Sequence, residues 1–293
     1  MVSESTPVNL QLPPRVSIGL PIYNGAAFVK NALDMLLNQT EKNFELIISD
    51  NNSSDGSTEI LLTAAAGDSR IRYYRHEKRL SMYDNFHYVL SHARGAYFMW
   101  AACDDGWDVD FIEKLAQRLD SQPKAIMAFG DVIIVTPTDK VGNLLPFDFQ
   151  TMGLGVVRRL QKLARLQCFY IYGLWRTDQI KSVPYSYCAW WPDLPLMLAA
   201  SILGPFLYVP KVCFYYYEVP KSNLTRVMQQ DYVTHFNLLM GIGGLIVAVY
   251  RACSKKGGLF IGGYAVTLVV WKQLLTILGY IRRRLVLHKK WLG

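Results

Sequence analysis

The feature that most constrains the fold is an alternation of short apolar runs with amphipathic stretches between residue 15 and about residue 135. One such stretch places Phe28, Ala32 and Leu36 four residues apart, the spacing of a helix with one buried face. Strands that alternate with helices of this kind form βαβ units. The sequence therefore predicts an α/β fold with a mixed, mainly parallel sheet flanked by helices. Its strands are expected over residues 16–20, 44–49, 71–75, 96–101, 125–129 and 132–135.

Composition narrows the class of protein. The 293 residues are 51% hydrophobic and 18% charged, which excludes a disordered or fibrous chain. Lys and Arg number 31 against 23 Asp and Glu, but residues 233–293 contain no acidic residue. The excess positive charge therefore lies in the C-terminal tail, and no nucleic acid partner is expected for the body of the chain.

The cysteines and the N-terminal residues favour a cytosolic chain. The five cysteines form no C-x-x-C pair, so neither a zinc site nor a disulfide framework is indicated. Residues 1–14 include an acidic residue and three prolines but no apolar run, which is not the pattern of a signal peptide. We expect a short leader there.

Polar residues follow three of the expected strands. They read PIYNG at 21–25, DNNSSDGS at 50–57 and CDDGW at 103–107. Open α/β sheets bind ligands where their strands end. The chain has no G-x-G-x-x-G and no G-x-x-x-x-G-K-[ST] motif, so neither a dinucleotide fold nor a P-loop is supported.

A carboxylate-lined pocket suits a sugar diphosphate only if a divalent cation lies between the two, because both are anionic. Mg²⁺ and Mn²⁺ prefer oxygen ligands, and Asp104 or Asp105 could bridge either ion to the two phosphates. Asp50 could accept hydrogen bonds from a base or a ribose. Each acid also has a structural alternative, since Asp50 could order a turn and Asp104 and Asp105 could cap the helix that starts near residue 109.

Three blocks in this order resemble glycosyltransferase family 2: R-V-S-I-G-L-P-I-Y-N at 15–24, L-I-I-S-D-N-N-S-S-D-G-S at 46–57 and G-A-Y-F-M-W-A-A-C-D-D-G-W at 95–107. The resemblance covers about residues 15–135. It implies a GT-A fold and inverting, metal-dependent transfer of a sugar from a nucleotide-sugar donor. It also implies that Asp104 and Asp105 bind Mg²⁺ or Mn²⁺, and that the donor contacts Pro21, Tyr23, Asn24, Asp50, Asn52, Ser53 and Asp104.

The chain departs from the family pattern at three places. Ala102 stands where the metal motif often has its first acid, so weak metal affinity is expected. Asn51 replaces the second acid of the second block. The family's catalytic base opens a later helix, and Asp193 matches it, although Pro192 replaces the usual partner acid. Asp193 could also be an ordinary helix cap.

The resemblance and the composition together divide the chain. Residues 1–14 are the leader and 15–230 the GT-A domain, with a nucleotide-sugar half at 15–135 and an acceptor half at 136–230. In the acceptor half we expect a loop at 136–157, a basic helix at 156–169 and a helix around 194–203. Trp190 and Trp191 could line an acceptor site or belong to the core.

Residues 231–293 form an apolar and basic tail that is expected to be helical. The apolar stretches at 233–250 and 258–280 are marginal as membrane spans, so helices lying on an anionic membrane or a re-entrant hairpin fit better. Arg282–Arg284 and Lys289–Lys290 would contact lipid headgroups on the cytoplasmic face. The alternative is a buried helical hairpin in a soluble dimer.

The leading functional hypothesis is a glycosyltransferase that acts on a glycan or lipid-linked acceptor in the assembly of cell-surface polysaccharide or glycoconjugate. A sugar nucleotidyltransferase is an alternative, but it would need a glycine-rich basic loop after the first strand, which P-I-Y-N-G-A-A lacks. A catalytically silent, membrane-bound scaffold is a second alternative, since acids are missing at three positions of the family pattern.

Overall fold

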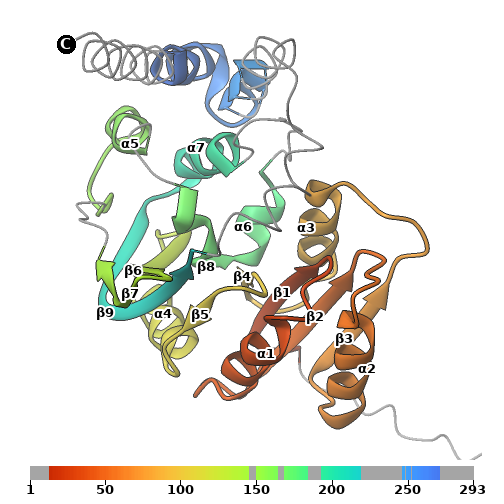
Figure 1. The fold of residues 1–293 in the computed structure, drawn as a ribbon. Coiled ribbons are helices and arrows are strands. Elements are labelled where there is room, and N and C mark those ends of the chain that lie inside the picture. Colours follow the sequence, from red (N-terminus) through yellow and green to blue (C-terminus); the bar gives the residue numbers. More distant parts are fainter. Residues whose placement is uncertain are drawn as a thin grey trace, which may run out of the picture.

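The computed structural model describes residues 13–144, 150–163, 168–183, 193–218, 246–247, 249–251 and 253–270. Helices and strands alternate through the first half of the chain (Figure 1). They are β1 (Val16–Ile22), α1 (Val29–Leu37), β2 (Phe44–Asp50), α2 (Ser57–Gly67), β3 (Ile71–Arg75), α3 (Met82–Ser91), β4 (Tyr97–Trp100), β5 (Gly106–Trp107) and α4 (Phe111–Asp120).

The second half adds strands and shorter helices. They are β6 (Met127–Thr136), β7 (Asp139–Leu144), α5 (Val156–Leu163), the 3₁₀ helix η1 (Cys168–Tyr172), β8 (Leu174–Arg176), α6 (Thr177–Lys181), α7 (Asp193–Leu203) and β9 (Phe206–Tyr217). Several predicted features lie outside the described residues. They are most of the leader expected at 1–14, Trp190, Trp191, Pro192 and the basic cluster at 282–290.

All described strands belong to one sheet in the order β3-β2-β1-β4-β8-β6-β9-β5, with β7 paired to β6. The strands β3, β2, β1 and β4 are parallel, and the register pairs Val16 with Phe44 and Ile22 with Asp50. Every residue of β1 and β2 is buried, as expected for strands covered on both faces. Figure 1 shows α1 and α2 on one face and α3 on the other.

The remaining strands make the sheet mixed. β8 lies between β4 and β6 and is antiparallel to both, whereas β9 is parallel to β6. The β6–β9 register shifts between Phe129 and Asp131, and a Cβ on Gly130 would lie 1.9 Å from the carbonyl oxygen of Val212. Glycine is therefore needed where these two strands approach most closely.

Three expectations for the second half were wrong in detail. The two strands expected at 125–129 and 132–135 are one strand, β6, because its pairing with β9 continues through the register shift. The loop expected at 136–157 contains β7, which forms an antiparallel hairpin with β6. The basic helix begins at Val156 as predicted but α5 ends at Leu163, and η1 follows from Cys168.

A chain of aromatic rings joins the two halves of the sheet. Phe98 meets Trp100 edge to face at 4.8 Å between ring centroids, Trp100 meets Trp175 at 6.5 Å, and Trp175 meets Phe206 at 5.5 Å. All four side chains are fully buried. Burial and edge-to-face contact both stabilise this packing, which holds the strands after residue 136 against β1 to β4.

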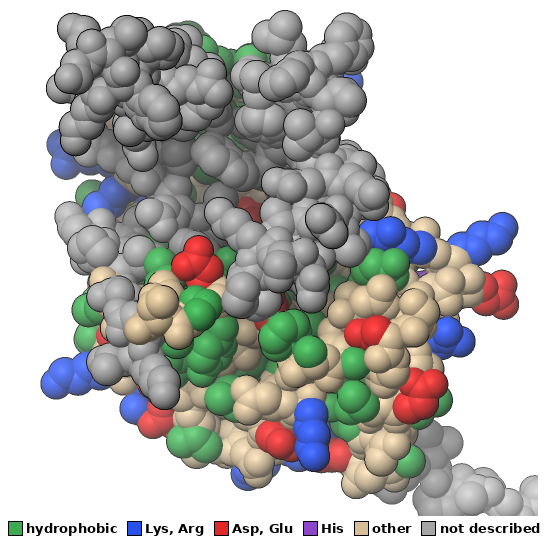
Figure 2. All heavy atoms as spheres, in the orientation of Figure 1, with side chains coloured by type: hydrophobic (Ala, Val, Ile, Leu, Met, Phe, Trp, Pro, Cys, Tyr) green, Lys and Arg blue, Asp and Glu red, His purple; other side chains and the backbone are tan. Residues whose placement is uncertain are grey.

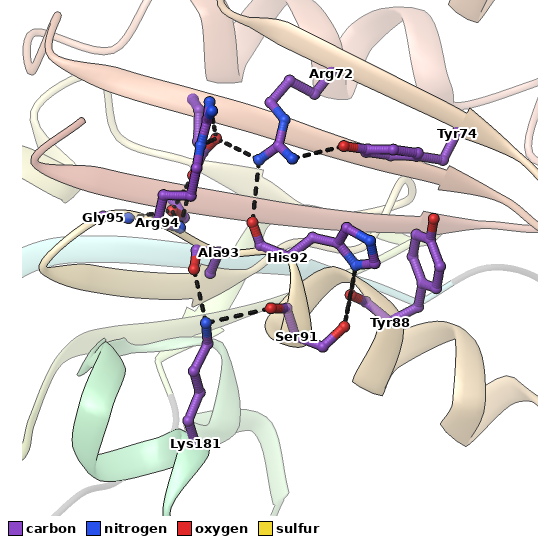
Figure 3. A network of polar contacts seen from close by, with 11 residues as sticks. Arg72, Tyr74, Tyr88, Ser91, His92, Ala93, Arg94, Gly95 and Lys181 are labelled. Atoms are coloured by element: carbon purple, nitrogen blue, oxygen red, sulfur yellow. Dashed lines mark hydrogen bonds and ion pairs between the residues drawn. The ribbon is translucent and has the colours of Figure 1, made fainter. Parts of the chain in front are cut away.

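A network of charged and polar side chains lies at the end of the sheet where the parallel strands begin (Figure 3). Glu45, near the start of β2, accepts hydrogen bonds from Ser17 at 2.6 Å, from Arg72 at 2.7 Å and from the Arg94 side chain at 2.8 and 3.0 Å. Burial by itself would raise the pKa of Glu45, but these hydrogen bonds outweigh it and lower the pKa below its usual value. The Glu45 cluster, Glu45 with Ser17, Arg72 and Arg94, thus holds β1, β2 and β3 to the start of β4.

The described part of the tail is a helix packed on α5 and on the residue that follows α6. Its residues Ala265 and Val269 are buried, the side chain of Gln161 in α5 donates to the Tyr264 hydroxyl at 2.7 Å, and Lys256 donates to Ser182 at 3.1 Å. None of the helices in the described ranges has the length and hydropathy needed to cross a membrane. On the face drawn in Figure 2, basic and acidic side chains of the described sheet region are interspersed.

Candidate functional site

The loops that follow β1 and β2 are joined into one unit. The Asn24 N–H donates to Ser53 Oγ at 3.0 Å, the Ser54 N–H donates to Asn24 Oδ1 at 2.9 Å, and the Gly25 N–H donates to Ser57 Oγ at 2.9 Å. Because β1 and β2 are adjacent and parallel, their ends meet at one edge of the sheet. Asn24 there has φ 52° and Asn52 has φ 60°, a left-handed conformation that asparagine tolerates better than most residues.

Asp50 stabilises this unit through three hydrogen bonds to its carboxylate. It is fully buried, and its carboxylate accepts hydrogen bonds from the Ser53 N–H at 2.9 Å, the Thr58 hydroxyl at 2.7 Å and the Tyr73 hydroxyl at 2.8 Å. Burial alone would raise the pKa of Asp50, but the hydrogen bonds lower it below its usual value. The carboxylate therefore orders the turn, which was the structural alternative, and its contact with a base or ribose stays a prediction.

Asn51 connects the site to the segment before α3. Its Nδ2 donates to the Leu80 carbonyl at 3.0 Å, and its Oδ1 accepts from the Leu80 N–H at 2.7 Å. The neighbouring Arg79 places its guanidinium 4.1 Å from the centre of the Tyr23 ring. Tyr23 and Asn24 are partly exposed, whereas Pro21 and Ser53 are buried, so the first pair is open to a ligand.

Asp104 and Asp105 lie on the turn between β4 and β5. Asp105 is only 3% exposed, and its Oδ1 has no hydrogen-bond partner among the described residues. Burial raises the pKa of Asp105 to about 8, with the charge of Asp104 adding to the effect, and burial also raises the pKa of Asp104. Two adjacent carboxylates with raised pKa values and an unpartnered oxygen are destabilised as anions, and a bound cation would relieve this.

This turn contacts both halves of the sheet. A Cβ on Gly25 would lie 2.7 Å from Cys103 Sγ, so the loop after β1 rests on the residue before Asp104. On the other side, β5 pairs with β9, and the backbone N–H of Tyr217 donates to Asp105. The structure therefore brings the predicted donor residues and the predicted metal residues to the same edge of the sheet.

Asp193 is the first residue of α7, as predicted for a base that opens a helix. It is partly buried, and burial raises its pKa to about 6. No hydrogen bond to its side chain is recorded within the described residues. A carboxylate with a pKa near neutrality suits general-base chemistry because it is ionised at neutral pH yet basic enough to take a proton.

The described residues contain no group of three or more His, Cys, Asp or Glu side chains that could hold a metal ion unaided. Asp104 and Asp105 still fit an oxygen-preferring cation, since they offer two carboxylates and one of their oxygens is buried without a partner. Remaining ligands would come from the phosphates and water, as is usual for Mg²⁺. Burial raises the pKa of the nearby Cys103 thiol to about 12, which disfavours it as a thiolate ligand.

Sequence reasoning missed several residues of this edge. At the end of β3, the Tyr73 hydroxyl donates a hydrogen bond to Asp50, and Arg75 Nε lies 3.8 Å from the Asp50 carboxylate. The guanidinium of Arg79 lies over the Tyr23 ring. The basic run R-H-E-K-R at 75–79 follows a parallel strand next to β2, and this position could have indicated them.

A family model described as Glycosyl transferase family 2 matches residues 17–168, just over half of the chain. The chain belongs to glycosyl transferase family 2. The expected family and the expected class of enzyme, a transferase, are thereby confirmed.

Relatives in this family match only part of the chain. An uncharacterized glycosyltransferase of Rickettsia bellii is 36% identical over 133 residues, which are 45% of this chain and 19% of the relative. TuaG of Bacillus subtilis, a glycosyltransferase named for teichuronic acid biosynthesis, is 28% identical over 130 residues, 43% of this chain and 52% of the relative. The match to the Rickettsia bellii protein thus spans about a fifth of that family member.

Solved structures confirm the GT-A fold of this family 2 chain. S. aureus TarS 1–349 in complex with UDP-GlcNAc has a TM-score of 0.63 at 14% identity, over 83% of this chain and 69% of that chain. The mannosyltransferase PcManGT from Pyrobaculum calidifontis, in complex with GDP-Man and Mn²⁺, has a TM-score of 0.56 at 14% identity, over 91% and 76%. At such identities the likeness concerns the fold, and the roles of individual residues stay predictions.

Proposed function

We propose that this family 2 chain transfers a sugar from a nucleotide-sugar donor to a glycan or lipid-linked acceptor, with inversion at the anomeric carbon. The observation that carries the proposal is the buried, unpartnered oxygen of Asp105 beside Asp104, at the edge where the loops after β1 and β2 meet. The ligands named for TarS and PcManGT, UDP-GlcNAc and GDP-Man with Mn²⁺, support a donor of this class.

Asp104 and Asp105 would hold Mg²⁺ or Mn²⁺, which neutralises charge on a departing nucleoside diphosphate. The partly exposed Tyr23 and Asn24 would face the nucleotide, and Asp50 would keep their loop in place. Asp193 would take the proton of the acceptor hydroxyl while the acceptor oxygen bonds to the anomeric carbon and the bond to the diphosphate breaks. Attack from the side opposite the leaving group inverts that carbon.

The first experiment is calorimetric binding of a panel of nucleotide sugars, including UDP-GlcNAc and GDP-mannose, with Mn²⁺ or Mg²⁺ and then with a chelator. We expect binding that needs the metal and that falls at least tenfold in Asp104→Asn, because a charge-assisted contact contributes roughly 1.5–3 kcal/mol. Asp110→Asn is the matched control, since Asp110 is a partly exposed acid of the same segment that pairs with Lys114.

Each result has a distinct meaning. Binding that is metal-independent and equal in Asp104→Asn would contradict the proposed metal site. Binding of a nucleotide sugar without transfer to any glycan or polyprenyl-linked acceptor would favour the catalytically silent scaffold. No binding of any donor would remove the support for transfer altogether.

We also propose that the acceptor belongs to cell-surface polysaccharide or glycoconjugate assembly at the cytoplasmic face of the membrane. The name of TuaG supports the pathway class. In the described tail helix, Leu259 is 73% exposed and Phe260 is 94% exposed, and Arg251 and Lys255 are exposed nearby. Apolar side chains flanked by basic ones suit an anionic bilayer surface better than water.

A further inference from the structure

Tyr172 occupies a position that neither the donor residues nor Asp193 explain. It is the last residue of η1, two residues before β8 begins, and its ring stacks on Phe214 of β9 with centroids 5.3 Å apart and an angle of 21°. Phe214 is the register partner of Trp107, which lies two residues after Asp105. The stacked pair therefore fixes the Tyr172 ring beside the Asp104–Asp105 turn.

The same ring also lies within electrostatic range of the other end of the site. Burial, followed by the charges of Asp105, Asp193 and Asp104, raises the pKa of Tyr172 well above its usual value. η1 packs directly against α7, the helix that Asp193 opens. Through the stack on Phe214 and the packing of η1 on α7, Tyr172 lies close to the turn that carries the predicted metal carboxylates and to the helix that the predicted base opens.

The Tyr172 side chain is partly exposed, and its hydroxyl makes no hydrogen bond to a described residue. A phenolic hydroxyl can donate one hydrogen bond and normally finds an acceptor. A ligand oxygen would supply the acceptor.

The geometry of the proposed reaction indicates which part of the ligand supplies this oxygen. In a displacement with inversion, the diphosphate leaves on one side of the anomeric carbon and the acceptor attacks from the other, so the transferred sugar lies between the metal site and the base. Building on the function proposed above, we propose that the Tyr172 hydroxyl donates a hydrogen bond to the transferred sugar and helps to select which sugar is bound. The contact adds to donor recognition without touching the nucleotide.

The test compares nucleotide sugars with their bare nucleotides in Tyr172→Phe, which keeps the stacked ring and removes only the hydroxyl. Affinities for UDP, UDP-GlcNAc, GDP and GDP-mannose with Mn²⁺ are measured by calorimetry. For the nucleotide that the wild type binds, we expect the sugar form to bind about three- to tenfold more weakly and the bare diphosphate to bind unchanged. Tyr170→Phe is the matched control from the same 3₁₀ helix, because the Tyr170 ring packs on Phe129 instead.

The other outcomes overturn the inference in different ways. Equal affinity of Tyr172→Phe and wild type for the sugar form would show that the hydroxyl does not contact the sugar, while the proposed function would stand. An equal loss for the bare diphosphate would place the hydroxyl at the metal site. If the wild type binds no nucleotide at all, the proposed function fails and the inference with it. Thermal unfolding of both variants close to that of the wild type excludes misfolding as the cause.

Discussion

The hydrogen bonds of Asn51 give a physical reason for the presence of an amide where the family resemblance predicts an acid. Its amide donates to the Leu80 carbonyl and accepts from the Leu80 N–H, so both ends of the side chain are used. A carboxylate could only accept and would leave the Leu80 carbonyl without its donor. Asn51, where the family resemblance led us to expect an acid, therefore holds the segment with Arg79 against the site.

At the residue scale, Asp193 supplies the clearest pH prediction. With a pKa of about 6, its carboxylate is ionised above that pH and protonated below it. Since only the ionised form can accept the acceptor proton, kcat/KM should be level above about pH 7 and fall close to tenfold per pH unit below about pH 6. Asp193→Asn should lower transfer by roughly 100-fold or more and leave donor binding unchanged.

Transfer rates and donor affinity measured on the same preparations check this prediction. Asp178→Asn is the control, because Asp178 is an exposed acid in the first turn of α6. A pH profile in the wild type without a step near 6, or full activity of Asp193→Asn, would rule out Asp193 as the base.

At the element scale, β9 holds in place the turn that carries Asp104 and Asp105. The Cys213 N–H and the Tyr215 hydroxyl donate to Asp108 at 2.7 and 2.9 Å, and the Tyr217 N–H donates to Asp105. A strand from the region predicted to bind the acceptor thus positions carboxylates that are predicted to serve the nucleotide-sugar donor. The boundary predicted near residue 135 divides the chain in sequence, whereas this site uses both parts.

The Glu45 cluster leads to a prediction about stability that does not involve the candidate site. Glu45→Gln would keep a side chain of similar shape but leave Arg72 and Arg94 without their counter-charge. Because Glu45 is buried, Arg72 is partly exposed and Arg94 is exposed, we expect the free energy of unfolding to fall by about 1–3 kcal/mol at pH 7. The folded-state pKa of Glu45 is lowered, so its contribution is present above its unfolded pKa of about 4.3 and lost as pH falls through the folded value.

Denaturant unfolding of wild type and variant at pH 7 and in acid measures this effect. The difference between them should be full at pH 7 and should narrow once the pH falls below about 4. Glu77→Gln, at an exposed position after β3, should be nearly neutral. A Glu45→Gln protein as stable as the wild type would show that the cluster contributes no net stability.

At the scale of the whole molecule, the two ends of the parallel strands carry different groups of residues. The edge where the parallel strands begin holds the Glu45 cluster, and the edge where they end holds the loops and carboxylates of the candidate site. The described tail helix contacts α5 and the residue after α6 (Figure 1). Its residues Leu259 and Phe260 are exposed. This arrangement leads to a prediction about the full chain and a membrane.

Full-length protein should sediment with vesicles that contain anionic phospholipid, and the bound fraction should fall as salt is raised. The double variant Leu259→Ser/Phe260→Ser should bind at least tenfold more weakly, because each apolar side chain contributes about 1.5–3 kcal/mol when buried. Leu62→Ser, at an exposed position of α2, should bind like the wild type. Protein that stays in the supernatant with anionic vesicles at low salt would contradict the proposed membrane surface.

The sequence by itself determined β1 to β4, the helix after β1, the family and the start of α7. These depend on local signals: apolar periodicity, polar residues at strand ends and an acid that opens a helix. Only the tertiary structure decided that β8 enters between β4 and β6, that β9 supports Asp105, and that Tyr172 lies near Asp104, Asp105 and Asp193. Such contacts join residues far apart in the chain, and they depend on which strand edges and ring faces meet once the core has packed, which no local pattern encodes.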